Sequence, residues 1–349
     1  MKSIFRWLPV AAALALLAQS GNAQNQTSGD IEILPVRGNV YLVAGAGGNI
    51  VLSAGADGVL MVDTGSAAMS GKTIAAINRL TRDLNTFRQP AKRREGGGGS
   101  GTVLTGIVPP KPIRYIINTS ASAEHVGGNP ALAAAGKTFT GGNVAGDLGD
   151  IGEGAAILAH ENLLQRLNEA KMPTRGQPTE TYYGSQMKLS HFFNDEGVQL
   201  LHVNNAITDG DSFVNFRVSD VIVAGDIFDF SGYPPIDLAR GGSIQGVLAG
   251  LNKMLEMVIP EFRSEGGTYV IPGHGRICDM ADLAYYRDMV TIIRDRVQDS
   301  IQKKMTLEQI KAAKLSEDWD GRFAKPTWTS DMFVEAVYKN LTTPPATKK

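Results

Sequence analysis

The chain has 349 residues, of which 43% are hydrophobic and 20% are charged, so it can bury the core of a large folded domain. Its 34 Lys and Arg residues balance 35 Asp and Glu residues, which argues against the clustered positive charge of a nucleic-acid-binding surface. The single cysteine, Cys278, excludes an intramolecular disulfide and a metal site built on paired cysteines. Any metal site therefore depends on where the five histidines fall, at His125, His160, His191, His202 and His274.

The N-terminus has the composition of a secretory signal peptide. Lys2 and Arg6 supply positive charge, residues 8–17 form a short apolar run, and Gly-Asn-Ala at 21–23 is a small-residue cleavage site. The apolar run is too short to span a membrane. We therefore expect a signal peptide at 1–23 that is cleaved on export, which places the protein in the periplasm or outside the cell. An uncleaved N-terminal anchor is the alternative interpretation.

Short apolar segments separated by glycine-rich turns follow the signal peptide. Such a pattern favours antiparallel strands joined by hairpins, which we predict at 31–34, 40–43, 50–53 and 59–62. A helix is predicted next, because Ile74, Ile77 and Leu80 recur at helical spacing. Residues 88–112 contain a Lys-Arg-Arg run and a Gly-Gly-Gly-Gly-Ser-Gly run, which predict a flexible surface insertion. A partner-binding loop is the alternative for this insertion.

The C-terminal third has the pattern of a helical region. Apolar residues at helical spacing predict helices at 244–259 and 283–301, and Thr306 begins a capping-box pattern. We expect one domain over 31–302 and a helical extension over 303–349 that packs on it. Aromatic residues are expected to pack the extension onto the domain, with an aromatic ligand platform as the alternative role, at Trp319, Trp328, Phe333 and Tyr338.

Five segments combine Asp, Ser, Thr and His residues with glycine-rich turns, at 61–65, 118–129, 206–212, 223–226 and 271–275. In their residues and their order they resemble the signature segments of the metallo-β-lactamase superfamily, from the early Val-Asp-Thr-Gly turn to the last Pro-Gly-His-Gly turn. The resemblance extends along nearly the whole chain after the signal peptide. It implies a four-layer αββα sandwich of the α/β (α+β) class, with the site at one edge between the two sheets.

The resemblance implies positions for two zinc ions, the first bound by three histidines in the family. The first-zinc positions here are Ser120, Ser122 and Ile207, and none of these residues has an imidazole. The two serines are better suited to cap the following helix than to hold a metal. The first metal site is therefore predicted to be lost.

The second-zinc positions are Glu124, His125 and His274, with Asp226 in the place of the bridging aspartate. Glu124 replaces an aspartate and is one methylene longer, so its carboxylate has to adjust to bind a metal within the ~0.2 Å that ligation tolerates. One divalent metal is possible here, with zinc expected before iron or manganese; the other possibility is no metal. If the protein is catalytic, Glu124 and Asp226 are the candidate catalytic residues.

Other polar residues have structural interpretations first. Asp63, Asp209 and Asp211 lie in tight turns, where a carboxylate accepts hydrogen bonds from backbone amides. Asp63, Asp209 and His160 are also candidates for orienting the metal-binding residues. His160 is expected at a strand-to-helix junction as a hydrogen-bonded structural residue, and His202 in a strand. His191 is expected in a loop, and Cys278 as a small buried hydrophobic residue.

Two hypotheses follow from these residues. The first is a periplasmic protein that keeps the sandwich and its edge cleft but is catalytically impaired or non-hydrolytic. The second is a single-metal hydrolase of an ester, lactone, β-lactam or related bond, in which Glu124, His125, Asp226 and His274 activate water. A nucleophilic Ser120 or Ser122 with His125 as base, and a single-iron sulfur dioxygenase, are less favoured. We expect a small-molecule ligand in the cleft and no nucleic acid; the oligomeric state stays open.

Overall fold

The computed structural model describes residues 30–88, 110–138, 154–189, 191–259 and 266–343. The signal peptide expected at 1–23 and most of the insertion expected at 88–112 lie outside the described residues. Among the described helices, none has the length and apolar character needed to cross a membrane.

The first sheet has seven strands that follow one another in chain order. Strands β1 to β4 pair antiparallel through short turns, as predicted, and β4 to β7 pair parallel. The strands are β1 (Glu32–Arg37), β2 (Val40–Ala44), β3 (Ile50–Gly55), β4 (Gly58–Val62), β5 (Ile113–Ile117), β6 (Ala156–His160) and β7 (Glu180–Tyr182). Parallel pairing needs crossover connections, and helix α1 (Ser70–Arg88) lies in the connection from β4 to β5.

The second sheet has five strands in the order β12-β11-β10-β9-β8. Its strands are β8 (Gln186–Lys188), β9 (Val198–His202), β10 (Ser212–Phe216), β11 (Val221–Gly225) and β12 (Tyr269–Pro272). Only β11 and β12 pair parallel among these described strands. The two strands are therefore aligned, and both run toward the same edge of the sheet.

Alternating side chains create separate apolar layers on the two faces of each sheet. In β4, Leu60 and Val62 face the core between the sheets, whereas Val59 and Met61 face the helices outside. In β11, Val223 faces the core between the sheets. Both strands are buried on both faces, as expected where helices cover each outer side of a sandwich.

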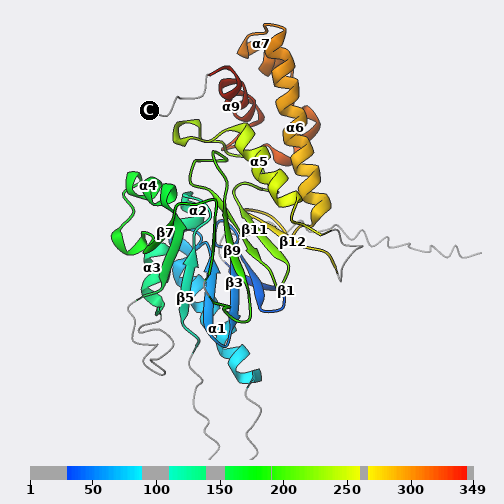
Figure 1. Ribbon diagram of the computed structural model, residues 1–349. Coiled ribbons are helices and arrows are strands. Elements are labelled where there is room, and N and C mark those ends of the chain that lie inside the picture. Colours follow the sequence, from blue (N-terminus) through cyan, green and yellow to red (C-terminus); the bar gives the residue numbers. More distant parts are fainter. Residues whose placement is uncertain (1–29, 89–109, 139–153, 190, 260–265, 344–349) are drawn as a thin grey trace, which may run out of the picture.

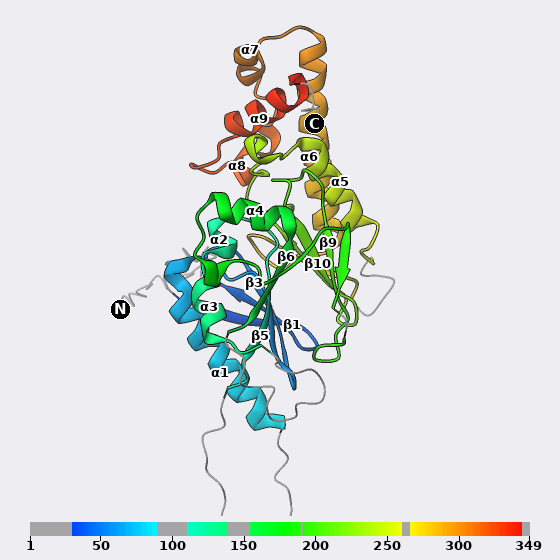
Figure 2. The ribbon, with the colours of Figure 1, turned by 60° about the vertical axis from the view of Figure 1, so that its left-hand side comes forward.

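The helices form the two outer layers (Figures 1 and 2). Helices α1 and α3 (Asn129–Ala135) cover the first sheet, where Ile77 of α1 is buried and Ile74 and Leu80 pack beside it. The second sheet is covered by α5 (Ile244–Leu255) and α6 (Met280–Gln302), and α9 (Ser330–Thr342) packs on α6. The remaining helices are α2 (Ala123–Val126), α4 (Glu161–Glu169), α7 (Leu307–Ala312) and α8 (Glu317–Phe323). The expected four-layer αββα sandwich is confirmed.

The candidate site residues lie on turns, and on the short helix α2, that follow the C-terminal ends of β4, β5, β9, β11 and β12. Asp63 comes directly after β4 and has a positive φ of 63°. Gly225, at the end of β11, has φ +57°, and a Cβ there would lie 2.5 Å from Thr119 Oγ1. Glycine therefore lets the β11 turn approach the β5 turn, which brings Asp226 close to Ser120.

Candidate functional site

A cleft of about 330 Å³ opens where these turns meet. Segments far apart in the sequence contribute to its wall, including Ser120, Ser122, Glu124, Ile207, Asp226, Asp229, His274, Lys325 and Trp328. All the expected metal-site residues except the fully buried His125 therefore line one cleft, and His125 lies directly beneath Asp226 in contact with it.

His125 is held between two carboxylates. Its Nδ1 lies 2.8 Å from Asp63 Oδ2, and its Nε2 lies 2.9 Å from Asp226 Oδ1. Burial by itself lowers the pKa of His125, but the charges of Asp226 and Asp63 outweigh burial and raise this pKa well above its usual value. Both ring nitrogens therefore act as donors, and the imidazolium neutralises part of the carboxylate charge.

Asp226 has a partner on each carboxylate oxygen. Oδ1 faces His125 Nε2, and Oδ2 accepts a 2.7 Å hydrogen bond from the Ser120 hydroxyl. Burial favours the neutral form, yet the charge and hydrogen bond of His125, with the help of His274, hold the pKa of Asp226 well below its usual range. Asp226 is therefore an anion that the protein itself already satisfies.

His274 reaches the cleft from the turn after β12. Its Nε2 lies 3.0 Å from Glu124 Oε2, and its Nδ1 lies 3.8 Å from Asp226 Oδ1 and 3.8 Å from Asp229 Oδ2. Nδ1 is buried and makes no hydrogen bond within the described part of the chain. The ring thus points an unpartnered nitrogen toward two carboxylate oxygens.

The donor set of His125, Asp226 and His274 fits one metal ion. One ligand atom from each lies within 4.8 Å of the others, and neighbouring ligands of a tetrahedral zinc ion are ~3.3 Å apart. The nitrogen of each histidine that faces away from this point is bonded to a carboxylate, Asp63 for His125 and Glu124 for His274. Carboxylates bonded in this way orient metal-binding histidines in proteins.

The three first-zinc positions carry no imidazole and have other roles. Ser120 donates to Asp226, and Ser122 is the N-cap of α2, where its hydroxyl accepts from the Glu124 amide. Ile207 is 5% exposed and belongs to the apolar cluster between the second sheet and its helices. This side of the cleft is therefore partly apolar.

The contacts of the serines also bear on a nucleophilic role. The Ser120 hydroxyl donates to a carboxylate, and the ring nitrogens of His125 face Asp63 and Asp226. A serine nucleophile needs a base with a free lone pair within hydrogen-bond reach. In this arrangement, His125 does not offer that lone pair to Ser120.

Of the three candidates for orienting groups, Asp63 contacts the site and the other two form a separate cluster. Asp63 bonds His125, whereas Asp209 makes a two-point ion pair with Arg166, at 2.9 and 2.8 Å. His160 ends β6, accepts a hydrogen bond from the Asn162 amide and caps α4. Among the described contacts, neither His160 nor Asp209 bonds to a residue of the metal-binding set.

The His160 ring stacks on His202, with ring centroids 3.6 Å apart and planes 3° apart. His202 lies in β9, and its Nδ1 bonds the backbone carbonyl of Asp211. His191 lies outside the strands, between β8 and β9, and Cys278 is buried, as expected from the sequence. These positions explain the histidines that take no part in the cleft.

Sequence reasoning did not identify Asp229 or Lys325. Asp229 Oδ2 lies 2.8 Å from Lys325 Nζ, and both residues line the cleft. The repeated Asp at 226 and 229 within one turn is a signal that could have pointed to Asp229. Lys325 is 96 positions farther along the chain, and no local pattern connects it to this turn.

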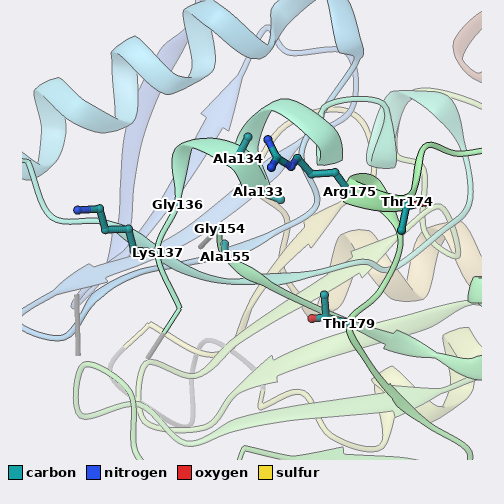
Figure 3. A pocket seen from close by; sticks show the side chains of 9 residues that line it. All are labelled: Ala133, Ala134, Gly136, Lys137, Gly154, Ala155, Thr174, Arg175 and Thr179. Carbon is teal, nitrogen blue, oxygen red and sulfur yellow. The ribbon is translucent and has the colours of Figure 1, made fainter. Parts of the chain in front are cut away.

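A larger hollow, of about 730 Å³, lies beside α3 and the 3-10 turn Thr174–Gly176 (Figure 3). Small residues line it together with the cations Lys137 and Arg175. None of the expected site residues is among the described residues that line this hollow. Size alone therefore does not mark the functional cleft.

No family model matches the sequence, and no curated protein matches it. Solved structures do resemble the fold. The inverting sec-alkylsulfatase Pisa1 from Pseudomonas sp. is 15% identical with a TM-score of 0.58, and the match covers 88% of this chain and 50% of that chain. A double mutant of this alkylsulfatase is 13% identical with a TM-score of 0.59, over 89% of this chain and 50% of that chain. This chain thus spans about half the length of the alkylsulfatase chains.

A metallo-β-lactamase from Pontibacter korlensis is 11% identical with a TM-score of 0.50, and the match covers 75% of this chain and 99% of that chain. At these identities the likeness establishes the fold and not the activity. Together with the two sheets, their helical layers and the edge cleft, it shows that this chain has the metallo-β-lactamase fold.

Proposed function

We propose that this chain is an exported, catalytically impaired protein of the metallo-β-lactamase fold, which binds a small molecule in its edge cleft without dinuclear zinc hydrolysis. The observation that carries the proposal is the identity of the first-zinc positions, Ser120, Ser122 and Ile207. A zinc ion needs several nitrogen, sulfur or carboxylate ligands, and an isoleucine side chain cannot ligate at all.

The hydrogen bonds of the cleft support this proposal. Ser120 donates to Asp226, and His125 lies between Asp226 and Asp63, so these four side chains satisfy one another. Buried polar groups that are already paired do not require an ion for stability. Ile207 adds an apolar wall, which suits the non-polar part of a small ligand.

A single-metal hydrolase is the second candidate, and the orientation of the histidines favours it. His125 Nε2, Asp226 Oδ1 and His274 Nδ1 would hold the ion, while Asp63 and Glu124 orient the two rings. His125 would have to release its Nε2 proton to the solvent before it could bind the ion. A bound zinc ion lowers the pKa of a water ligand to ~7, which supplies a nucleophile for an ester, lactone or β-lactam. In this arrangement Glu124 positions His274 instead of ligating the ion itself.

Metal content separates the two candidates. The mature protein is purified without chelator and dialysed against a zinc-containing buffer. We expect it to hold well below one equivalent of metal, as measured by elemental mass spectrometry. The matched variants are His274→Ala, which removes a candidate ligand, and His191→Ala, which removes an exposed histidine outside the cleft. Near one equivalent in the unaltered protein and in His191→Ala, lost in His274→Ala, would overturn the impaired form of the proposal.

Export is tested by the mature N-terminus. Expression of the full chain in a bacterial host should yield a periplasmic protein that begins at Gln24, because the small residues at 21–23 form the cleavage site. Intact-mass measurement of the periplasmic fraction checks this expectation. A protein that keeps residues 1–23 and sediments with membranes would contradict it and support the uncleaved anchor.

A further inference from the structure

We propose that the ammonium group of Lys325 competes with a divalent metal ion for the cleft, because it forms an ion pair with the Asp229 carboxylate. The inference rests on the proposed function and deepens it, because it gives a physical reason for weak metal binding beyond the loss of the first-zinc ligands. It concerns two residues, Lys325 and Asp229, that belong to none of the expected ligand positions.

Asp229 lies in the wall of the cleft. The residue is 4% exposed. Its Oδ1 accepts hydrogen bonds from both the amide and the hydroxyl of Ser231, at 2.8 and 2.7 Å. Oδ2 is therefore left to face the cleft, where it lies 2.8 Å from Lys325 Nζ and 3.8 Å from His274 Nδ1. Lys325 and the unpartnered nitrogen of His274 thus approach the same oxygen.

The backbone of Lys325 belongs to a hydrogen-bonded turn. A tight turn joins α8 to α9, in which Lys325 and Trp328 exchange two backbone hydrogen bonds of 3.1 Å. The Trp328 indole donates to the Pro234 carbonyl at 3.1 Å, which fixes the turn to the segment that follows Asp229. The backbone of Lys325 is therefore held by this anchored turn, and only its side chain is free to move.

Gly232 lies against the end of the Lys325 side chain. A Cβ at Gly232 would lie 2.5 Å from Lys325 Cε and 2.8 Å from its Nζ. Real Cβ atoms do not come this close to other heavy atoms, so the missing side chain at Gly232 makes room for the end of Lys325.

The charge of Lys325 opposes a metal ion in the cleft. Lys325 places a positive charge in the cleft, where its Nζ lies 2.8 Å from Asp229 Oδ2. A divalent ion bound by His274 Nδ1 and Asp226 would lie beside Asp229 Oδ2 and close to the ammonium group. Like charges in a partly buried cleft repel each other more strongly than in water. Loss of Lys325 would remove this repulsion and free Asp229 as an additional oxygen ligand.

The test compares metal affinity in two charge-matched variants. Lys325→Met removes the ammonium group and keeps an unbranched side chain. Lys311→Met removes one charge of the same sign from the ion pair with Glu335, which is not among the residues that line this cleft. Zn²⁺ and Co²⁺ are titrated into each metal-free protein at fixed pH and ionic strength, with a chromogenic chelator as competitor.

We expect Lys325→Met to bind Zn²⁺ at least tenfold more tightly than the unaltered protein and Lys311→Met, and to develop the Co²⁺ absorption of a nitrogen- and oxygen-ligated ion. Adding Asp229→Asn to Lys325→Met should abolish most of this gain. Equal dissociation constants in Lys325→Met and the unaltered protein, or no binding by Lys325→Met at any concentration, would overturn the inference.

If Lys325→Met does not fold, Gly232→Ala provides the same comparison. Its new Cβ would meet the end of Lys325 at 2.5 Å and Asp229 Oδ2 at 3.2 Å, so it displaces the flexible lysine first while the charge of the chain stays constant. A tighter Zn²⁺ dissociation constant supports the inference, and an unchanged one overturns it. A full equivalent of metal in the unaltered protein would contradict the proposed impaired function, whereas the ratio of dissociation constants would still decide the role of Lys325.

Discussion

Replacing His125 with alanine should lower the free energy of unfolding by ~3–5 kcal/mol, because it removes one partner from a buried set of charges. His125 is 0% exposed and contacts Asp63 and Asp226 at 2.8 and 2.9 Å. Both carboxylates would stay buried after the substitution, next to a cavity the size of an imidazole. The loss comes mainly from these uncompensated charges and less from the lost packing.

Urea unfolding at neutral pH, followed by circular dichroism, measures this loss. His191→Ala is the matched control, because His191 is exposed, and it should stay within ~0.5 kcal/mol of the unaltered protein. Combining His125→Ala with Asp63→Asn should recover part of the loss, since one of the two unpaired charges is then removed. A cost below ~1 kcal/mol for His125→Ala would contradict the buried charge cluster.

As the pH falls from 7 to 5, the free energies of unfolding of His202→Phe and Asp211→Asn should change in opposite directions relative to that of the unaltered protein. Burial, followed by the neighbouring charge of His160, lowers the pKa of His202, and burial likewise lowers the pKa of His160. The unfolded chain therefore binds these protons first as the pH falls through about 6.5. The stability that the stacked neutral rings provide is present above this pH and is lost below it.

The pH dependence of stability that Asp211 contributes has the opposite sign. Burial raises the pKa of this carboxyl to about 7 in the folded protein, from a usual value of 3.8. The folded chain therefore binds this proton first as the pH falls. The contribution of Asp211 to stability is fully present below about pH 4 and is lost as the pH rises toward 7. The two effects partly cancel in the unaltered protein.

Urea unfolding at a series of pH values separates these contributions. Relative to the unaltered protein, His202→Phe should gain stability as the pH falls, because it keeps a flat ring and cannot be protonated. Asp211→Asn should gain relative stability as the pH rises, because it keeps the oxygen that accepts from the Thr208 amide. Each difference has a limiting slope of ~1.4 kcal/mol per pH unit. Differences that stay constant over this range would contradict the assignment of these two groups.

Much of the fold could be predicted because its signals are local. The hairpins β1 to β4 follow from glycine-rich turns between apolar runs, and the capping box at Thr306 with Gln309 starts α7 as expected. Leu60 and Val62 pack on one face of β4, and alternation along a strand predicts such a face. The pairing of the parallel strands could not be predicted from local pattern, because it depends on distant segments; only the family resemblance implied the sandwich.

The site was predictable to the extent that its residues follow strand ends. His125, Asp226 and His274 come together because the C-terminal ends of β5, β11 and β12 meet at one edge. The partners of these residues were not predictable. Glu124 bonds His274, and Lys325 bonds Asp229, through contacts across 150 and 96 positions of sequence. Charge compensation of this kind depends on atomic distances that a single sequence does not specify.

The anchored turn between α8 and α9 has a consequence for how such a cleft changes in evolution. Lys325, Thr327 and Trp328 form part of the wall, although the sheets that define the fold end at β12 (Tyr269–Pro272). Without the residues after α6, Asp229 would lose its lysine, and the core beside the second sheet would lose Phe323 and Phe333. Substitutions within this tail therefore change the wall of the cleft without changing a residue of either sheet.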